Sequence, residues 1–150
     1  MVTHHIPTSK AMEEFGAKLA HACHKCGIVH LRGELGAGKT TLVRGFLQAL
    51  GHAGSVKSPT YTLVEVYQLN ACMIYHFDFY RLSDPEELEY LGIRDYLGDN
   101  VICLIEWPEY GGELTPIADV QVSISYHAKS RILKLQAYNA TGQEIIANFL

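Results

Sequence analysis

Residues 33–40 read GELGAGKT, which has the spacing G-x-x-x-x-G-K-[ST]. In this pattern the glycines let the backbone turn its N–H groups inward around phosphates, the lysine reaches the β- and γ-phosphates, and the last hydroxyl binds Mg²⁺. An apolar run at residues 28–31 precedes the segment, and a helical pattern follows it. A strand before and a helix after are the context of a phosphate-binding loop, so the segment predicts a nucleotide site rather than a glycine-rich turn that only caps a helix.

The helix predicted after this loop has one apolar face, and Gly51 ends it. Its N-terminus directs unpaired N–H groups and the positive end of the helix dipole at bound phosphates. The residues of the apolar face are Leu42, Val43, Phe46, Leu47 and Leu50.

Composition sets limits on the rest of the chain. A length of 150 residues, 48% hydrophobic residues and a formal charge of −4 predict one globular domain over residues 1–150. We expect neither a membrane span nor a secretory signal, because no long apolar run exists and residues 1–10 lack a basic segment followed by an apolar one. A cytoplasmic location is therefore expected. A pI near 6.0 argues against a domain that binds nucleic acid by bulk charge.

Cysteine and histidine spacing does not favour a zinc site. Cys23 and Cys26 have C-x-x-C spacing, but a structural zinc site needs a second pair of ligands. We therefore predict reduced, partly buried thiols. Among the histidines, His76 is notable because it lies two residues before an acidic residue, Asp78.

Hydrophobic periodicity predicts an α/β fold: a single P-loop NTPase-like domain with a mixed parallel and antiparallel central sheet flanked by helices. A hairpin at residues 68–72 makes part of the sheet antiparallel. The other predicted elements are a helix from Thr8 or Ser9 to about Cys26, a helix capped by Asp84 with Pro85 first and ending by Gly92, a short turn at 93–97, a helix after Gly142, and strands at 28–31, 62–69, 73–80, 101–105, 120–126 and 131–138.

Two acidic residues are candidates for organising Mg²⁺. Glu106 directly follows the apolar strand at 101–105 and so lies at its carboxyl end, where ligands bind in α/β sheets. Its ordinary alternative is a solvated acid at a strand end. Asp78 lies among aromatic residues, where an unpaired carboxylate is costly to bury, and its ordinary alternative is an ion pair with Arg81 or another cation.

The segment SPTYT at residues 58–62 stands where GTPases carry a loop whose hydroxyl senses the γ-phosphate. Thr60 or Thr62 would serve here, and a proline-initiated turn is the alternative. Trp107, the only tryptophan, follows Glu106. It either contacts the nucleotide or a partner, or packs in the core.

The sequence favours ATP over GTP, because no N-K-x-D segment is present to read guanine. It also lacks an arginine-rich lid of the kind that small-molecule kinases close over their substrates. Two alternatives to an ATPase remain open: a small-molecule kinase, and a non-hydrolytic binding module that is gated by nucleotide.

Five segments together resemble the bacterial TsaE (formerly YjeE) family: GELGAGKTTL at 33–42, SPTYTLVEVY at 58–67, HFDFYRL at 76–82, EYLGIRDYL at 89–97 and ICLIEWPE at 102–109. Many nucleotide hydrolases share the first motif, but the others in this order are specific to the family. The resemblance implies a small Mg²⁺-dependent ATPase that works with the TsaB and TsaD proteins. Their product is the threonylcarbamoyl modification at adenosine 37 of tRNA, which this chain would reach through the complex. Since no arginine finger is evident, we expect slow hydrolysis alone and stimulation by the partners.

The resemblance also implies roles for individual residues. Thr40 and Glu106 would bind Mg²⁺. The residues implied in catalysis are Asp78, Lys39, Thr60, Thr62 and Trp107. The residues implied in nucleotide binding are Glu34, Gly36, Ala37, Gly38, Lys39, Thr40, Thr41, Ser9 and Arg131. Met12 stands where family members often carry threonine, which leaves Thr8 and Ser9 as the nearby polar candidates.

Overall fold

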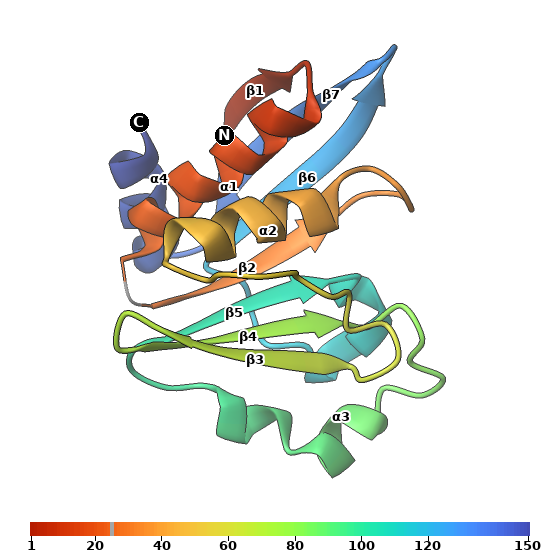
Figure 1. Ribbon diagram of the computed structural model, residues 1–150. Coiled ribbons are helices and arrows are strands. Elements are labelled where there is room, and N and C mark those ends of the chain that lie inside the picture. Colours follow the sequence, from red (N-terminus) through yellow and green to blue (C-terminus); the bar gives the residue numbers. More distant parts are fainter. Residues whose placement is uncertain (25) are drawn as a thin grey trace.

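Seven strands form one mixed sheet in the order β1-β7-β6-β2-β5-β4-β3 (Figure 1). This computed structural model describes residues 1–24 and 26–150. The central strands β6, β2, β5 and β4 run parallel, whereas β7 and β1 at one side and β3 at the other pair antiparallel. The predicted fold class, with its mixed sheet, is thus confirmed. The strands are β1 (Val2–Ile6), β2 (Gly27–Arg32), β3 (Val64–Leu69), β4 (Cys72–Asp78), β5 (Val101–Glu106), β6 (Val120–His127) and β7 (Ser130–Ala137).

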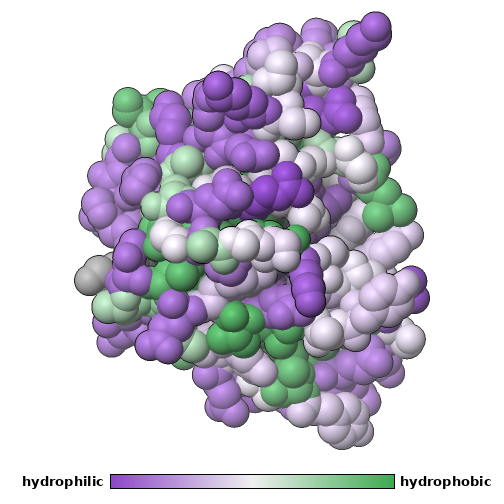
Figure 2. Space-filling model, viewed as in Figure 1, coloured by the Kyte–Doolittle hydropathy of each residue, from purple (hydrophilic) through white to green (hydrophobic). Residues whose placement is uncertain are grey.

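Helices cover both faces of the sheet, as Figure 1 shows. On one face α1, α2 and α4 pack against the sheet around the larger hydrophobic core. On the other face α3 and two 3₁₀ helices enclose a smaller core. The surface in Figure 2 is mainly hydrophilic, with hydrophobic residues in small separate groups. The helices are α1 (Ser9–Cys23), α2 (Lys39–Ala49), α3 (Glu87–Leu91), α4 (Ala140–Phe149), η1 (Ile93–Tyr96) and η2 (Pro108–Leu114).

Local chemistry explains several of these elements. The Thr8 hydroxyl caps α1 by accepting from the Ala11 N–H at 3.1 Å. The predicted hairpin between β3 and β4 turns at Asn70 and Ala71, both of which have positive φ, as a tight hairpin turn requires. The strand predicted at 101–105 is confirmed as β5, and five of its six residues are buried.

One strand was not predicted, and several boundaries differ from the predictions; the strands predicted at 62–69 and 73–80 are observed at Val64–Leu69 and Cys72–Asp78. Strand β1, a short edge strand that pairs with β7, was not predicted. Helix α1 ends at Cys23, and the C-x-x-C segment includes residue 25, which lies outside the described residues. The Asp84 carboxylate accepts from the Glu86 N–H, as the predicted cap requires, but the turn after it is closed by i→i+3 bonds from Glu87 and Leu88, so the α-helical part, α3, begins at Glu87 rather than at Pro85. Helix α4 begins two residues before Gly142, where the Asn139 side chain caps it.

Two general features concern membranes and thiols. No helix within residues 1–24 and 26–150 is long and apolar enough to cross a bilayer. Cys23, Cys72 and Cys103 are buried and Cys26 is exposed. Burial raises the pKa of Cys103 to about 12, which keeps this thiol protonated at neutral pH.

Candidate active site

The phosphate loop connects β2 to the N-terminus of α2. Gly36 and Gly38 have φ angles of 78° and 116°, which side chains other than glycine rarely adopt. A side chain at Gly38 would also meet the Met12 methyl group at 3.0 Å. The loop therefore needs glycine at these two positions for its backbone conformation, whereas the end of the flexible Met12 side chain can move aside.

Lys39 is buried at the first position of α2. Its ammonium donates to the carbonyls of Gly33 and, at 3.1 Å, Glu34, and it lies 4.4 Å from the centre of the Trp107 ring. Burial lowers the pKa of Lys39, while the nearby carboxylates of Glu106 and other acids oppose that shift. These acids favour a positive charge beside the loop.

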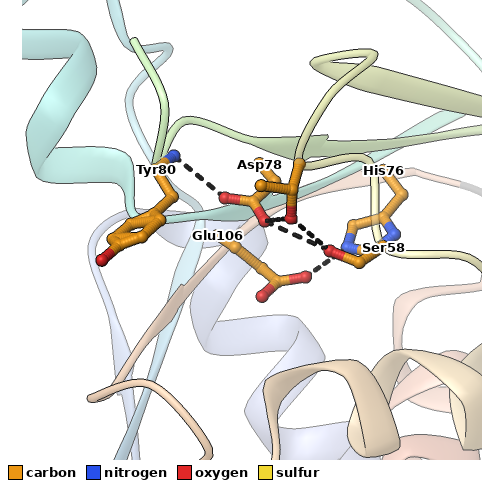
Figure 3. A network of polar contacts seen from close by, with 6 residues as sticks. Ser58, His76, Asp78, Tyr80 and Glu106 are labelled. Atoms are coloured by element: carbon orange, nitrogen blue, oxygen red, sulfur yellow. Dashed lines mark hydrogen bonds and ion pairs between the residues drawn. The ribbon is translucent and has the colours of Figure 1, made fainter.

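Asp78 and Glu106 are the last residues of the parallel strands β4 and β5, and they are direct partners in the register. Their carboxylates are close to one another (Figure 3), although the two residues are only 4% and 3% exposed. Like charges in a buried place are costly unless other groups compensate them. Each of the two acids has its own hydrogen-bond donors that compensate its charge.

Asp78 is held mainly by neutral donors. Its Oδ2 accepts from the hydroxyls of Thr60 at 3.1 Å and Ser58 at 3.4 Å, and its Oδ1 accepts from the Tyr80 N–H at 2.9 Å (Figure 3). Burial raises the pKa of Asp78 above its ordinary value, the Tyr80 and Thr60 hydrogen bonds lower it, and Glu106 raises it further. Within the described residues no ion pair joins Asp78 to Arg81 or to another cation, so the ordinary alternative considered for Asp78 is wrong.

Glu106 is held by a histidine. His76 Nε2 lies 2.6 Å from Glu106 Oε2, and the His76 side chain is fully buried. The imidazole donates to the carboxylate in the tautomer that carries hydrogen on Nε2. Its Nδ1 is buried without a hydrogen-bond partner in the described part of the chain. His76 thus spans from β4 to β5 and fixes one oxygen of the acid.

These side chains line a cavity of about 340 Å³ at the carboxyl ends of β4 and β5. Trp107 forms one wall. It stacks on Tyr110 and packs at a tilt against Tyr80, with ring centres 5.3 and 5.1 Å away, and adopts a left-handed conformation with φ of 55°. Such conformations are costly for side chains other than glycine and occur frequently at active sites. The cavity is lined by residues 35–41 of the loop and helix together with Ser58, Thr60, Asp78, Tyr80, Arg81, Glu106 and Trp107.

A second cavity, of about 330 Å³, lies on the other side of the phosphate loop. The side-chain candidates for nucleotide binding outside the loop, Ser9 and Arg131, line it, as does Met12. Arg131 Nε donates to the Ala37 carbonyl at 3.2 Å, which ties β7 to the loop. The two cavities share Gly36 and other loop residues, so they provide adjoining spaces for a phosphate tail and a larger group.

Most residues predicted from the sequence therefore meet around the loop. Thr62 does not: it is exposed, and its hydroxyl lies 3.1 Å from Glu65 Oε1. Glu34 contributes its backbone carbonyl to Lys39. The sequence reading did not single out Ser58, Tyr80 or Arg81 for the site. Their signal is their position, since each lies within two to three residues of Thr60 or Asp78.

The oxygen donors fit a hard cation such as Mg²⁺. Thr40 and the two acids line the same cavity. Among the described residues, no three His, Cys, Asp or Glu side chains are grouped to hold a metal by themselves. Mg²⁺ ordinarily uses one or two carboxylates together with waters and substrate phosphates, and it does not require a cage made only of protein.

Known proteins resemble this chain in both sequence and fold. The family described as threonylcarbamoyl adenosine biosynthesis protein TsaE matches residues 6–133. The tRNA threonylcarbamoyladenosine biosynthesis protein TsaE of Haemophilus influenzae is 52% identical over 99% of this chain and 97% of its own. The protein of that name in Bacillus subtilis is 40% identical over 72% of this chain and 68% of its own. The crystal structure of Bacillus subtilis YdiB is similar with a TM-score of 0.81 and 26% identity, over 99% of this chain and 93% of that one. The chain belongs to the TsaE family of threonylcarbamoyl adenosine biosynthesis proteins.

Proposed function

We propose that this chain binds and hydrolyses ATP as the ATPase of tRNA threonylcarbamoyladenosine synthesis, acting with TsaB and TsaD. One observation carries the proposal: Lys39 and the buried acids Asp78 and Glu106, from three separate elements, line one cavity with the phosphate loop. Family membership places the chain among the biosynthesis proteins of this modification. The ATPase activity is our inference from the site.

The residues of the site match the needs of phosphoryl transfer to water. The loop N–H groups and the Lys39 ammonium offset the negative charge that develops on the γ-phosphate. Asp78 accepts a hydrogen bond from the attacking water and orients it. Thr40 and Glu106 would hold Mg²⁺, which when bound neutralises phosphate charge.

We assign ATP rather than GTP because the sequence lacks the N-K-x-D segment that reads guanine. In this assignment the phosphates lie at the loop, and the nucleoside lies toward the cavity lined by Ser9 and Arg131. We place the protein in the cytoplasm, where it reaches tRNA through the complex with TsaB and TsaD.

Titration calorimetry with ATP in magnesium buffer tests the binding part of the proposal. The wild-type chain is expected to bind ATP, and Lys39→Ala is expected to weaken binding at least tenfold, because the lysine contacts the phosphates. Lys134→Ala is the matched control, since Lys134 is an exposed lysine on β7. Absence of ATP binding by the wild type, even with TsaB and TsaD present, would refute the proposal.

Turnover assays separate the ATPase from its two alternatives. A small-molecule kinase consumes ATP only when its metabolite is added, and a phosphorylated product appears. A nucleotide-gated binding module binds ATP tightly, but the assembled complex releases no phosphate over multiple turnovers.

A further inference from the structure

Arg81 lines the phosphate cavity, and within the described residues it has no carboxylate partner. Its Nη2 donates to the Tyr61 hydroxyl at 3.1 Å, and its guanidinium lies 4.3 Å from the centre of the Tyr61 ring. Tyr61 is 84% exposed. Both contacts are with a neutral group near water, where cation–π contacts are weak.

Other arginines of the chain are more strongly engaged. Arg32, Arg44 and Arg94 each form an ion pair with a glutamate. Arg131 donates to two backbone carbonyls. Within residues 1–24 and 26–150, Arg81 has no ion pair of this kind. A guanidinium that lines a phosphate cavity without a carboxylate partner retains its capacity to bind an anion.

The arrangement around Asp78 explains why this capacity is preserved. Asp78 lies only three residues before Arg81, yet its oxygens accept from Thr60, Ser58 and the Tyr80 backbone. These neutral donors occupy the carboxylate, and the arginine stays available. Tyr61, the group that holds Arg81, belongs to the same segment as Ser58 and Thr60. One segment therefore contacts both Asp78 and Arg81.

We propose that Arg81 is a catalytic residue that leaves Tyr61 and binds the γ-phosphate oxygens during hydrolysis, an inference that rests on the proposed ATPase function. In this step the water oxygen forms a bond to the γ-phosphorus. The bond from that phosphorus to the β–γ bridging oxygen breaks, and ADP leaves with the electron pair. The proton lost by water ends on the released phosphate. The guanidinium stabilises the charge that is spread over the transferring oxygens.

Variants of Arg81 test this role through a comparison of two ligands. We expect Arg81→Ala to lower phosphate release about tenfold or more, by the same factor with and without the partner proteins. Affinity for ADP with aluminium fluoride, which mimics the transferring phosphoryl group, should fall about tenfold or more, whereas affinity for ADP alone should change less than about threefold. Arg81→Lys should recover part of both losses, because it keeps the charge but not the planar fork.

Arg94→Ala is the matched control, since Arg94 is exposed, pairs with Glu89 and lies apart from the residues that line the cavity. Wild-type phosphate release in Arg81→Ala would overturn the proposal. So would a loss confined to stimulation by the partners, which would make Arg81 a docking residue, or an equal loss of affinity for both ligands. If the wild type itself releases no phosphate under any condition, the ATPase function fails and the role of Arg81 fails with it. If the wild type hydrolyses ATP and the Arg81 variants release phosphate at the wild-type rate, only the proposed role of Arg81 is overturned.

Discussion

The Asp78 carboxylate lies beside the phosphate loop, but it is buried in a place that disfavours its negative charge. Hydroxyl and N–H donors compensate part of its charge, but burial and the neighbouring Glu106 still raise its pKa. Active sites commonly retain such groups at a cost in stability, because removing the group removes the function. We therefore expect stability and turnover to respond in opposite directions when Asp78 is changed.

Asp78→Asn should abolish turnover, spare ATP binding, and raise the melting temperature of the nucleotide-free protein by a few degrees at pH 7. The sign follows from the raised pKa: the folded state favours the protonated carboxyl, so the wild type loses stability as pH rises through that pKa, and asparagine does not. The gain should shrink toward pH 4. Melting curves across this range check it, with the exposed Asp99→Asn as control. Unchanged turnover in Asp78→Asn would assign Asp78 to structure alone.

His76→Leu should lower the free energy of unfolding by about 3 kcal/mol, because it leaves the buried Glu106 carboxylate without its partner at 2.6 Å. His76→Gln keeps an N–H donor of similar reach and should lose much less. Urea denaturation compares the two variants. Equal losses of unfolding free energy in the two variants would show that the hydrogen bond to Glu106 contributes little to stability and that only the packing of the His76 side chain matters.

Local sequence pattern predicted several of the residues that line the candidate site. The loop spacing identifies Lys39 and Thr40, and the end of an apolar strand identifies Glu106. It did not separate Thr60 from Thr62, because both are hydroxyls in one short segment and only the fold places the first of them 3.1 Å from Asp78. The direction of the Arg81 side chain likewise depends on contacts that only the folded chain makes.

Helices α1 and α2 cross closely, and this contact supports the phosphate loop at the start of α2. A Cβ at Gly16 would lie 2.1 Å from the Leu42 carbonyl oxygen, and one at Gly45 would lie 2.1 Å from that of Glu13. Each helix thus offers a glycine where the other approaches. Because Lys39 begins α2, this packing also fixes the start of the helix against the phosphate site.

Gly45→Ala should therefore lower the free energy of unfolding by about 2 kcal/mol or more, since backbone atoms cannot move aside easily. The control is Gln48→Ala, an exposed position on the same helix, which should change stability by less than about 0.5 kcal/mol. Urea denaturation measures both. Equal midpoints for Gly45→Ala and the wild type would contradict the close helix contact.

Strand β1 and helix α4, which were missed or misplaced in the predictions, depend on distant parts of the chain. Strand β1 is short and carries His4 and His5, and its register pairs it with β7 at the other end of the chain. Helix α4 begins early because Asn139 caps it and also donates to Asp119. By contrast, β5 and the hairpin of β3 and β4 were predicted correctly because their apolar runs and turn residues are local.

At the scale of the whole molecule, strand order creates the site. Strand β5 lies between β2 and β4, so the phosphate loop that follows β2 adjoins the acids that end the other two strands. Leu31 near the loop pairs in register with Glu106, which pairs with Asp78. Periodicity along the chain predicts that strands exist but does not give their order, so this juxtaposition could not be derived from the sequence pattern alone.

Ligand binding at this junction should stabilise the folded chain as a unit. At an ATP concentration of about 100 times the dissociation constant, with Mg²⁺, the gain is about 2.7 kcal/mol, which corresponds to roughly 5 to 10 °C in melting temperature for a chain of this size. Lys39→Ala should show a much smaller shift at the same concentration. A wild-type melting temperature that ATP and Mg²⁺ leave unchanged would argue against the nucleotide site.

Phosphate release over multiple turnovers directly tests the proposed ATPase function of this chain. We would measure it for this chain alone, with TsaB and TsaD, and then with tRNA added, always beside Asp78→Asn. We expect slow, Mg²⁺-dependent release by the chain alone, faster release with the partners, and none above background from the Asp78→Asn variant. Absence of release by the wild type in all three mixtures, or equal release by wild type and variant, would contradict the proposed function.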